Sequence, residues 1–419
     1  MTLHPHITFL KSVFLYSITA FGGPQGHILA MTKIFVDQRK DISEKELFEY
    51  NTFCSLLPGA SSTQILLLIA QKKGGYTLTL LTLLVWILPA TILMGSLSIL
   101  LTSPISSHNA LSHFRFLQPM VVGFIIYAAY RAFHQLSDSK VSVLLSFFLA
   151  ALCLLFYKSP LIIPITLLAG GTIARYTITA TENLSKLKKP RIRWLHLTIF
   201  ISVFLLSGTL SELSKKNNWS GRAYFNLFEN CYRFGSIVFG GGDVMIPIMY
   251  EQYVARPTSE RVKTRNQNVL RIDKDLFLSG AGFVRTIPGP LFSFSAFAGG
   301  AAMSGKGVYH QIGGILTATI SIFLPTLLLV LFFHPLWEYM HRFKSLTSIF
   351  QGIHAATVSI MLASAVYLSK DAILMQSNHY LSVHPINTLS VLLTLFFLMY
   401  RVLSPLSITI TFLFLGFLF

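Results

Sequence analysis

Charged residues are scarce in this chain. Of its 419 residues only 12% are Asp, Glu, Lys or Arg, against roughly a quarter in soluble domains, whereas 53% are hydrophobic. Apolar stretches recur along the sequence, with the length of about 17–25 residues that crosses a bilayer as a helix. The composition therefore excludes an ordinary soluble domain and predicts a multi-pass membrane protein.

Acidic residues are the scarcest charged type. The chain has 16 Asp and Glu against 33 Lys and Arg, a net charge of +17. A basic chain can bind nucleic acid by neutralising phosphates. Here, however, the Lys and Arg residues lie mostly in short loops between apolar segments, where membrane topology places them. We therefore expect the lipid bilayer, and not nucleic acid, as a partner.

The sequence also lacks the usual signatures of bound groups. Cys54, Cys153 and Cys231 are far apart and fit no disulfide or metal spacing, so we expect them to pack as small apolar residues. No phosphate-binding P-loop is present, so we expect no ATP hydrolysis by this chain. No cofactor and no metal ion are expected. The first apolar segment runs into a glycine motif without a small-residue cleavage site, and we interpret it as a retained helix.

A duplicated glycine motif organises the chain. FGGP at 21–24 and FGGG at 239–242 align at an offset of 218 (239 minus 21). A second pair, Pro58-Gly59 and Pro288-Gly289, aligns at an offset of 230 (288 minus 58). The difference of 12 residues is explained by the polar run at 256–271. The two halves are therefore diverged copies of one unit.

The predicted fold class is all-α, with about 10–12 transmembrane helices in two homologous repeats that contain broken helices. The expected boundaries are 1–176 for the first repeat, 177–195 for a basic linker and 196–419 for the second repeat. A weaker basic bias at 37–51 than at 256–274 favours an inverted repeat over a parallel one. The apolar span at 195–210 is either an extra helix or the counterpart of the first helix.

The sequence also indicates two helix caps and one loop. Ser43, followed by Glu46 three residues on, forms a capping box, and Asp273 is a second helix cap. The four residues Lys72-Lys73-Gly74-Gly75 are expected to form a short loop.

Broken helices at matching places in a repeat are the best sequence indication of a transporter's binding site, although small residues also serve helix packing. A half-helix that starts after such a break directs unpaired N–H groups and partial positive charge at a cavity, which favours an anion. The first-half candidates for substrate binding are Gly22, Gly23, Pro24, His27, Pro58, Gly59, Ser61, Ser62 and Gln64. The second-half candidates are Gly240, Gly241, Gly242, Asp243, Arg285, Pro288, Gly289, Pro290 and Ser293.

Three of these candidates carry titratable or charged side chains. Arg285 could bind an oxyanion with its guanidinium group, or it could extend to the membrane surface. His27 is a candidate for a coupled proton or for simple packing. Asp243 could stabilise a helix N-terminus, carry a proton, or pair with Arg233 or Arg285. His354 is a weaker candidate for a proton site.

The motifs FGGPQGHI (21–28), FGGGDVMIP (239–247) and PGP (288–290) together resemble the chromate transporter family in its long two-domain form. The resemblance covers nearly the whole chain. It implies a secondary transporter that moves chromate outward, in exchange for sulfate or coupled to protons. The first-half PGP of the family reads Pro58-Gly59-Ala60 here, which leaves open whether chromate itself is the substrate.

We therefore predict a transporter, and not an enzyme, in the bacterial plasma (inner) membrane. The expected partners are an oxyanion, chromate or sulfate, and the bilayer, with a homodimer left open. The two repeats would rock against each other around the bound anion. The alternatives are the same architecture carrying another anion or small metabolite, a channel, and a membrane enzyme. An enzyme acting on a lipid-linked substrate would need clustered acids or histidines at one membrane face.

Overall fold

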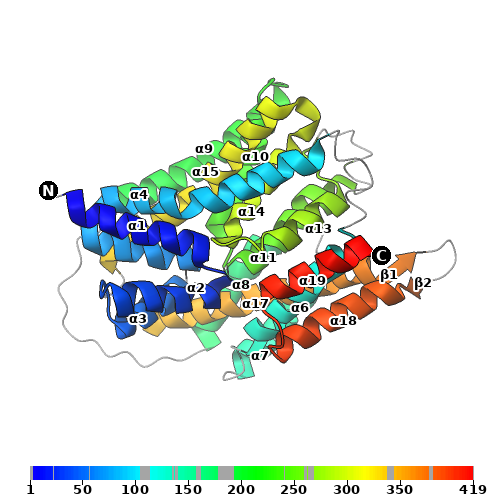
Figure 1. Ribbon diagram of the computed structural model, residues 1–419, viewed down its shortest axis with the longest axis horizontal. Helices are drawn as coiled ribbons and strands as arrows, with labels where there is room; N and C mark the ends of the chain where they lie inside the picture. Colours follow the sequence, from blue (N-terminus) through cyan, green and yellow to red (C-terminus); the bar gives the residue numbers. More distant parts are fainter. Residues whose placement is uncertain are drawn as a thin grey trace.

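The structure is a computed structural model, and it describes residues 3–21, 23–55, 57–103, 114–134, 136, 140–156, 162–177, 193–239, 241–258, 262, 269–336, 344–376 and 381–418. The described chain is helical (Figure 1). One pair of three-residue antiparallel strands, β1 (Leu374–Gln376) and β2 (Leu381–Val383), pairs Leu374 with Val383. The all-α prediction is confirmed, with this short strand pair as an addition.

The first half follows the predicted order of broken helices. Its elements are α1 (Leu3–Thr19), α2 (Gly23–Met31), the π-helix η1 (Thr32–Gln38), α3 (Glu44–Ser55), α4 (Ser61–Thr102), α6 (Leu117–His134), α7 (Lys140–Leu155) and α8 (Ile162–Thr177). The glycine motif separates α1 from α2, and Pro58-Gly59 separates α3 from α4. Both breaks therefore lie where the sequence predicts them.

The second half repeats this order. Its helices are α10 (Arg222–Ile237), α11 (Gly242–Tyr250), η2 (Glu251–Ala255), η3 (Arg256–Thr258), α13 (Lys274–Phe283), η4 (Leu291–Ser293), α14 (Phe294–Ala302), η5 (Ser304–Lys306), α15 (Val308–Phe333), η6 (His334–Leu336), α17 (Lys344–Ile373), α18 (Pro385–Met399) and α19 (Pro405–Leu418). Because α10 leads into the second glycine motif as α1 leads into the first, α9 (Trp194–Lys216) is the extra helix.

Two helices begin at the caps that the sequence indicates. The N–H of Glu46 donates to Ser43 Oγ at 3.2 Å, and this bond starts α3. The carboxylate of Asp273 accepts from the N–H groups of Asp275 and Leu276 at 2.9 and 3.1 Å at the start of α13. Such caps satisfy N–H groups that have no partner inside the helix.

The expected loop at Lys72-Lys73-Gly74-Gly75 is instead a kink within α4. Only the two glycines leave helical geometry, at φ −149° and φ +64°, and the second value is one that favours glycine. The lysines stay helical and form ion pairs, Lys72 with Glu46 at 2.6 Å and Lys73 with Asp41. Pro89 lies inside the second part of α4, as Pro325 lies inside α15.

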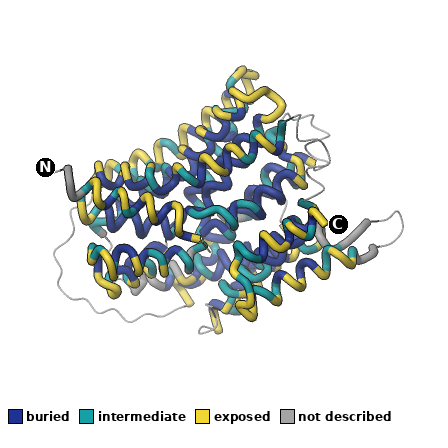
Figure 2. The backbone as a smooth tube through the Cα atoms, in the orientation of Figure 1, coloured by how far each residue is buried: buried dark blue, intermediate teal, exposed yellow. Residues whose placement is uncertain are grey.

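The chain is a multi-pass membrane protein. In the part of the chain that the structure describes, four segments have the length and apolar composition to cross a bilayer: Ser61–Thr102, Trp194–Lys216, Val308–Phe333 and Gln351–Lys370. Large apolar side chains stay exposed on the outer faces, such as Leu84, Leu88 and Ile92 of α4, while the interior is buried (Figure 2). The number of crossings, the inverted orientation and the repeat boundaries stay predictions, and residues 178–192 of the linker lie outside the described residues.

The helices pack into two groups (Figure 1). In one group α4 packs with α1, α14 and α15, and α9 and α10 pack against α15 and against each other. In the other group α6, α7 and α8 pack with α17, and α18 and α19 pack against α6. Each group contains helices of both repeats. The expected rocking of one repeat against the other stays a prediction, and in this packing each repeat contributes helices to both groups.

Candidate functional site

The two Pro-Gly breaks bond reciprocally to the two glycine breaks. The N–H of Gly59 donates to the carbonyl of Val238 at 2.7 Å, and the N–H of Gly289 donates to the carbonyl of Ala20 at 3.1 Å. Val238 and Ala20 are equivalent positions, 218 residues apart (238 minus 20). Gly59 and Gly289 have nearly the same φ, +114° and +112°. Reciprocal contacts of this kind are typical of two copies related by a pseudo-twofold axis.

Three helix N-termini meet at these breaks. Helix α2 begins at Gly23, α4 begins at Ser61 and α11 begins at Gly242. The backbone reaches α2 through Gly23 at φ +69° and α11 through Gly241 at φ +88°, both in the left-handed region that glycine adopts without a side-chain clash. Each helix start carries unpaired N–H groups and partial positive charge. The local geometry therefore suits a negatively charged ligand.

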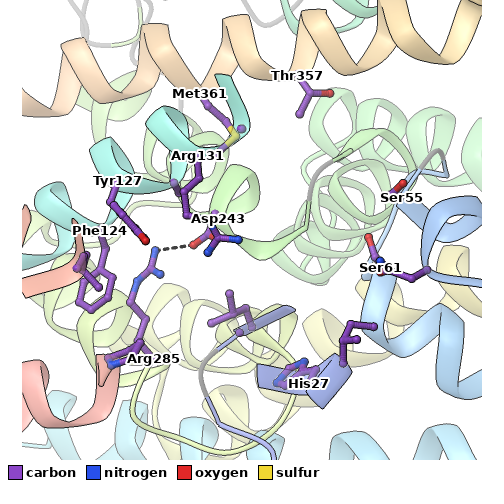
Figure 3. Close-up of a pocket in the computed structure, with 18 of the residues that line it drawn as sticks. His27, Ser55, Ser61, Phe124, Tyr127, Arg131, Asp243, Arg285, Thr357 and Met361 are labelled. Atoms are coloured by element: carbon purple, nitrogen blue, oxygen red, sulfur yellow. Dashed lines mark ion pairs between the residues drawn. The ribbon is translucent and has the colours of Figure 1, made fainter. Parts of the chain in front are cut away.

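A cavity of about 680 Å³ lies beside these helix starts, between the two helix groups (Figure 3). The predicted site residues that line it are Gly23, His27, Ser61, Asp243, Arg285 and Gly289. A smaller pocket shares His27 and Ser61 with this cavity. The predicted residues that line only the smaller pocket are Ser62, Gly241, Gly242 and Pro290. Residues from both repeats are thus brought to one place.

Other predicted residues lie behind this wall. Among the cavity linings that the structure describes, Pro58, Gly59, Gln64, Pro288 and Ser293 do not appear. Gln64 Nε2 donates to the carbonyl of Pro58 at 2.7 Å, which supports the first break. The hydroxyl of Ser293 is buried without a hydrogen-bond partner. Pro24 lies in α2, and Gly22 and Gly240 lie outside the described residues.

Arg285 is buried at the cavity, with 8% of its side chain exposed. Its Nη2 lies 2.8 Å from Asp243 Oδ1, and its guanidinium carbon lies 4.6 Å from the ring centre of Phe124. Its Nε and Nη2 have no hydrogen-bond partner. A buried guanidinium group with unused donors is costly unless a ligand completes it. This placement decides against the alternative in which Arg285 extends to the membrane surface.

Asp243 lies in the first turn of α11, where a negative charge stabilises the helix N-terminus. Of the two arginines considered as its partner, the structure pairs it with Arg285. Arg233 instead pairs with Glu229 on its own helix at 2.7 Å and donates to Asn230. Figure 3 shows Asp243 and Arg285 side by side at the cavity, joined by the ion pair.

His27 connects α2 to α4. Its side chain is 2% exposed, and a hydrogen bond of 2.9 Å joins its Nδ1 to Ser62 Oγ. The ring contacts Trp86 and Tyr16 edge-on, with ring centres 5.5 and 6.2 Å apart. His27 therefore lines both pockets while aromatic side chains fix its orientation.

Sequence reasoning missed a second arginine. Arg131 lies in the last turn of α6 and lines the cavity, with its guanidinium carbon 5.8 Å from the ring centre of Tyr127. An arginine at the end of an apolar span looks like an ordinary interfacial residue. Asn51, Ser55 and Thr357 also line the cavity, as does His354, which the sequence offered as a weak candidate.

Paired broken helices around a cavity are typical of one class of protein, the membrane transporters. The sequence model of the chromate transporter family matches residues 7–174 and 225–417, which is nearly the whole chain in two segments. The chain belongs to the chromate transporter family. The resemblance seen in the motifs is thereby confirmed.

Two relatives span most of the chain. An uncharacterised transporter of Methanocaldococcus jannaschii is 22% identical over 421 residues, covering 99% of this chain and 94% of its own length. A chromate transport protein of Pseudomonas aeruginosa is 23% identical over 356 residues, covering 85% of this chain and 79% of its own length. No solved structure matches.

Proposed function

We propose that this chain is a secondary active transporter of a tetrahedral oxyanion in a bacterial plasma membrane. Its substrate is chromate, which it exports in exchange for sulfate or together with protons. Family membership and the similarity to a chromate transport protein support the substrate class. The anion binds in the cavity, against the starts of α2, α4 and α11.

The observation that carries this proposal is the convergence of positive charge on one cavity. Arg131 and Arg285 both line it, and so do the first residues of α2 and α4. Arginine binds oxyanions through paired N–H donors. A dianion site without a nearby cation would be implausible in a membrane interior, because burying the charge alone costs many kcal/mol. Two cations and the helix ends supply compensation, while one carboxylate, that of Asp243, lines the same cavity and opposes it.

The size of the cavity favours a second candidate. About 680 Å³ falls in the range of pockets for drug-sized ligands, roughly 300–1,000 Å³. A tetrahedral oxyanion fills a small part of it and leaves room for water. A larger organic anion would fill more of the same cavity and would use the same arginines. The experiment therefore tests both a tetrahedral oxyanion and an organic anion as the substrate.

Movement between the two helix groups would open the cavity to alternate sides. The wall of the cavity comes partly from α6 and α17, through Arg131 and His354, and partly from α2 and α4. The reciprocal bonds at Gly59 and Gly289 cross between the repeats on the broken-helix side. Sliding of α6 and α17 along that side would change access while the anion stays at the helix ends.

The test is anion uptake into proteoliposomes that are preloaded with unlabelled sulfate and contain purified protein. Labelled sulfate and chromate are supplied outside, with and without a proton gradient. The matched variants are Arg285→Gln and Glu229→Gln, since Glu229 belongs to an arginine pair away from the cavity. Saturable uptake that only Arg285→Gln abolishes supports the proposal.

A competition series separates the two substrates. Unlabelled chromate, molybdate, phosphate and a set of dicarboxylates are each added to the uptake assay. Inhibition by the tetrahedral dianions supports the oxyanion, and inhibition by dicarboxylates alone supports the organic anion. Absence of saturable flux for every anion would overturn the proposal.

A further inference from the structure

We infer that Asp243 is a built-in competitor for Arg285, and that it takes up a proton when the oxyanion binds. This inference rests on the proposed function. In the empty site the carboxylate of Asp243 is paired with the guanidinium group of Arg285, which the substrate needs. Binding of the anion then displaces the carboxylate, and the displaced carboxylate becomes a carboxylic acid. Arg285 keeps its charge throughout.

The geometry of the ion pair supports displacement. Asp243 Oδ1 and Arg285 Nη2 lie 2.8 Å apart, yet neither atom takes part in a properly aligned hydrogen bond. Arg285 Nε is also without a partner. Attraction between charges holds the pair, and the donors on Nε and Nη2 are left without an aligned acceptor. A tetrahedral oxyanion can accept two parallel N–H bonds from one guanidinium group. The substrate can therefore form with Arg285 the bonds that Asp243 does not form.

Charge balance links the anion to a proton. Among the lining residues that the structure describes, the side chains that carry charge at neutral pH with neutral histidines are those of Arg131, Arg285 and Asp243, which sum to +1. A dianion in that site leaves an uncompensated charge of −1 in a low-dielectric environment. Protonation of Asp243 raises the site to +2, which the dianion neutralises. Anion binding therefore favours protonation of Asp243, and by linkage a lower pH favours anion binding.

The other titratable groups near Asp243 are part of the test. His27, His354 and Tyr127 line the same cavity. On the adjoining α10, Arg233 and Glu229 pair with each other, and Glu251 begins η2 after α11. Among the lining residues that the structure describes, Asp243 is the acid. The histidines could give a pH dependence of the same sign, so they need variants of their own.

The experiment measures equilibrium binding of labelled sulfate to the purified protein between about pH 5.5 and 8, the range in which histidine and shifted carboxyl groups titrate. Sulfate is used because it stays a dianion over this range, whereas chromate takes up a proton. Uptake of one proton per anion predicts binding that tightens up to about tenfold for each unit of falling pH.

The expected result for Asp243→Asn is binding at pH 8 that is at least about tenfold tighter than that of the wild type, with the pH dependence lost. Glu229→Gln, which removes the carboxylate of a different arginine pair, should keep the wild-type pH profile. His27→Gln and His354→Gln should change affinity and keep the slope. Arg285→Gln should lose binding at every pH, because the competitor and the substrate share this residue.

Two outcomes would overturn the inference while leaving the proposed function intact. Weaker sulfate binding by Asp243→Asn at every pH would make Asp243 a positioning residue for Arg285. A slope that survives in Asp243→Asn and disappears in a histidine variant would place the proton on that histidine. If no variant and no wild-type protein binds any oxyanion at any pH, the proposed function itself fails.

Discussion

The two broken-helix regions have the same backbone and different chemistry. The breaks at Gly59 and Gly289 share φ within 2° (114 minus 112) and make equivalent cross-repeat hydrogen bonds. At the charged positions the copies differ. Arg285 corresponds to Ser55 (285 minus 230), and Asp243 corresponds to Gln25 (243 minus 218). In the opposite direction, His27 corresponds to Met245 (245 minus 218). Both copies kept the helix breaks, but at the breaks themselves the Arg–Asp pair is present in the second copy alone.

This difference separates two tasks. The backbone breaks position helix N-termini around the cavity, and both copies are needed to build that geometry. Arg285 and its partner Asp243 need to be present in one copy alone, because the cavity holds one substrate. Backbone substitutions should therefore act alike in both copies, whereas substitutions of the charged side chains should act on one copy alone.

The largest expected contrast is between Arg285→Gln and Ser55→Ala. Losing a buried cation that contacts an anion costs about 2–5 kcal/mol, so we expect at least about a thirtyfold loss of sulfate uptake efficiency. Ser55 donates internally to the carbonyl of Thr52 at 2.7 Å, so its loss should change uptake less than about threefold. Initial uptake rates in proteoliposomes measure both. Similar losses from both variants would contradict a one-sided ionic site.

Alanine at either break glycine should destabilise the protein by a similar amount. A Cβ at Gly59 would lie 2.8 Å from Thr326 Oγ1, and one at Gly289 would lie 2.9 Å from the Cβ of Ala90. Both would also hold a φ that alanine adopts at a cost of about 1–3 kcal/mol. Fluorescence-detected thermal unfolding in detergent should show comparable decreases in Tm. A decrease in only one variant would break the proposed equivalence of the two breaks.

Arg131→Gln should weaken anion binding by about fivefold, a cost near 1 kcal/mol. Arg131 comes from the first repeat, on α6, so this variant asks whether the positive charge of the site is shared between repeats. Equilibrium sulfate binding provides the measurement. An affinity equal to that of the wild type would confine the ionic site to Arg285.

The smallest expected contrast is between Ser62→Ala and Met245→Leu. Ser62→Ala removes the hydrogen bond to His27 Nδ1, which is worth about 1 kcal/mol, and should lower sulfate affinity by up to about fivefold. Met245→Leu, at the position that matches His27, should stay within about twofold because it exchanges one apolar side chain for another. Binding titrations at one pH compare the two variants. An equal or larger effect of Met245→Leu would count against a specific role of His27.

Local sequence signals predicted the elements well. The caps at Ser43 and Asp273, the breaks at Pro58 and Pro288, and the glycine motifs all depend on residues close together in the chain. The same signals could not decide between a loop and a kink at 72–75. Lys72 and Lys73 stay helical there and form ion pairs with Glu46 and Asp41, which lie about 30 positions earlier in the sequence.

The site needed information that no local pattern contains. Arg131 reaches the cavity only because α6 packs against α13 and α17. Asp243 pairs with Arg285 on a distant segment, while Arg233 pairs with Glu229 on its own helix. The bonds that link each Pro-Gly break to the opposite glycine break join equivalent positions of different repeats. Each of these contacts is set by how distant helices pack, and not by the spacing of residues in the sequence.

The most direct test of the account is a structure of the protein with selenate, a tetrahedral dianion whose selenium atom can be located by anomalous diffraction. The account predicts one selenium peak in the cavity, within hydrogen-bonding reach of the Arg285 guanidinium group and beside the starts of α2 and α4. The same protein must transport sulfate, and selenate must inhibit that transport. A selenium peak outside this cavity in such protein would contradict the account.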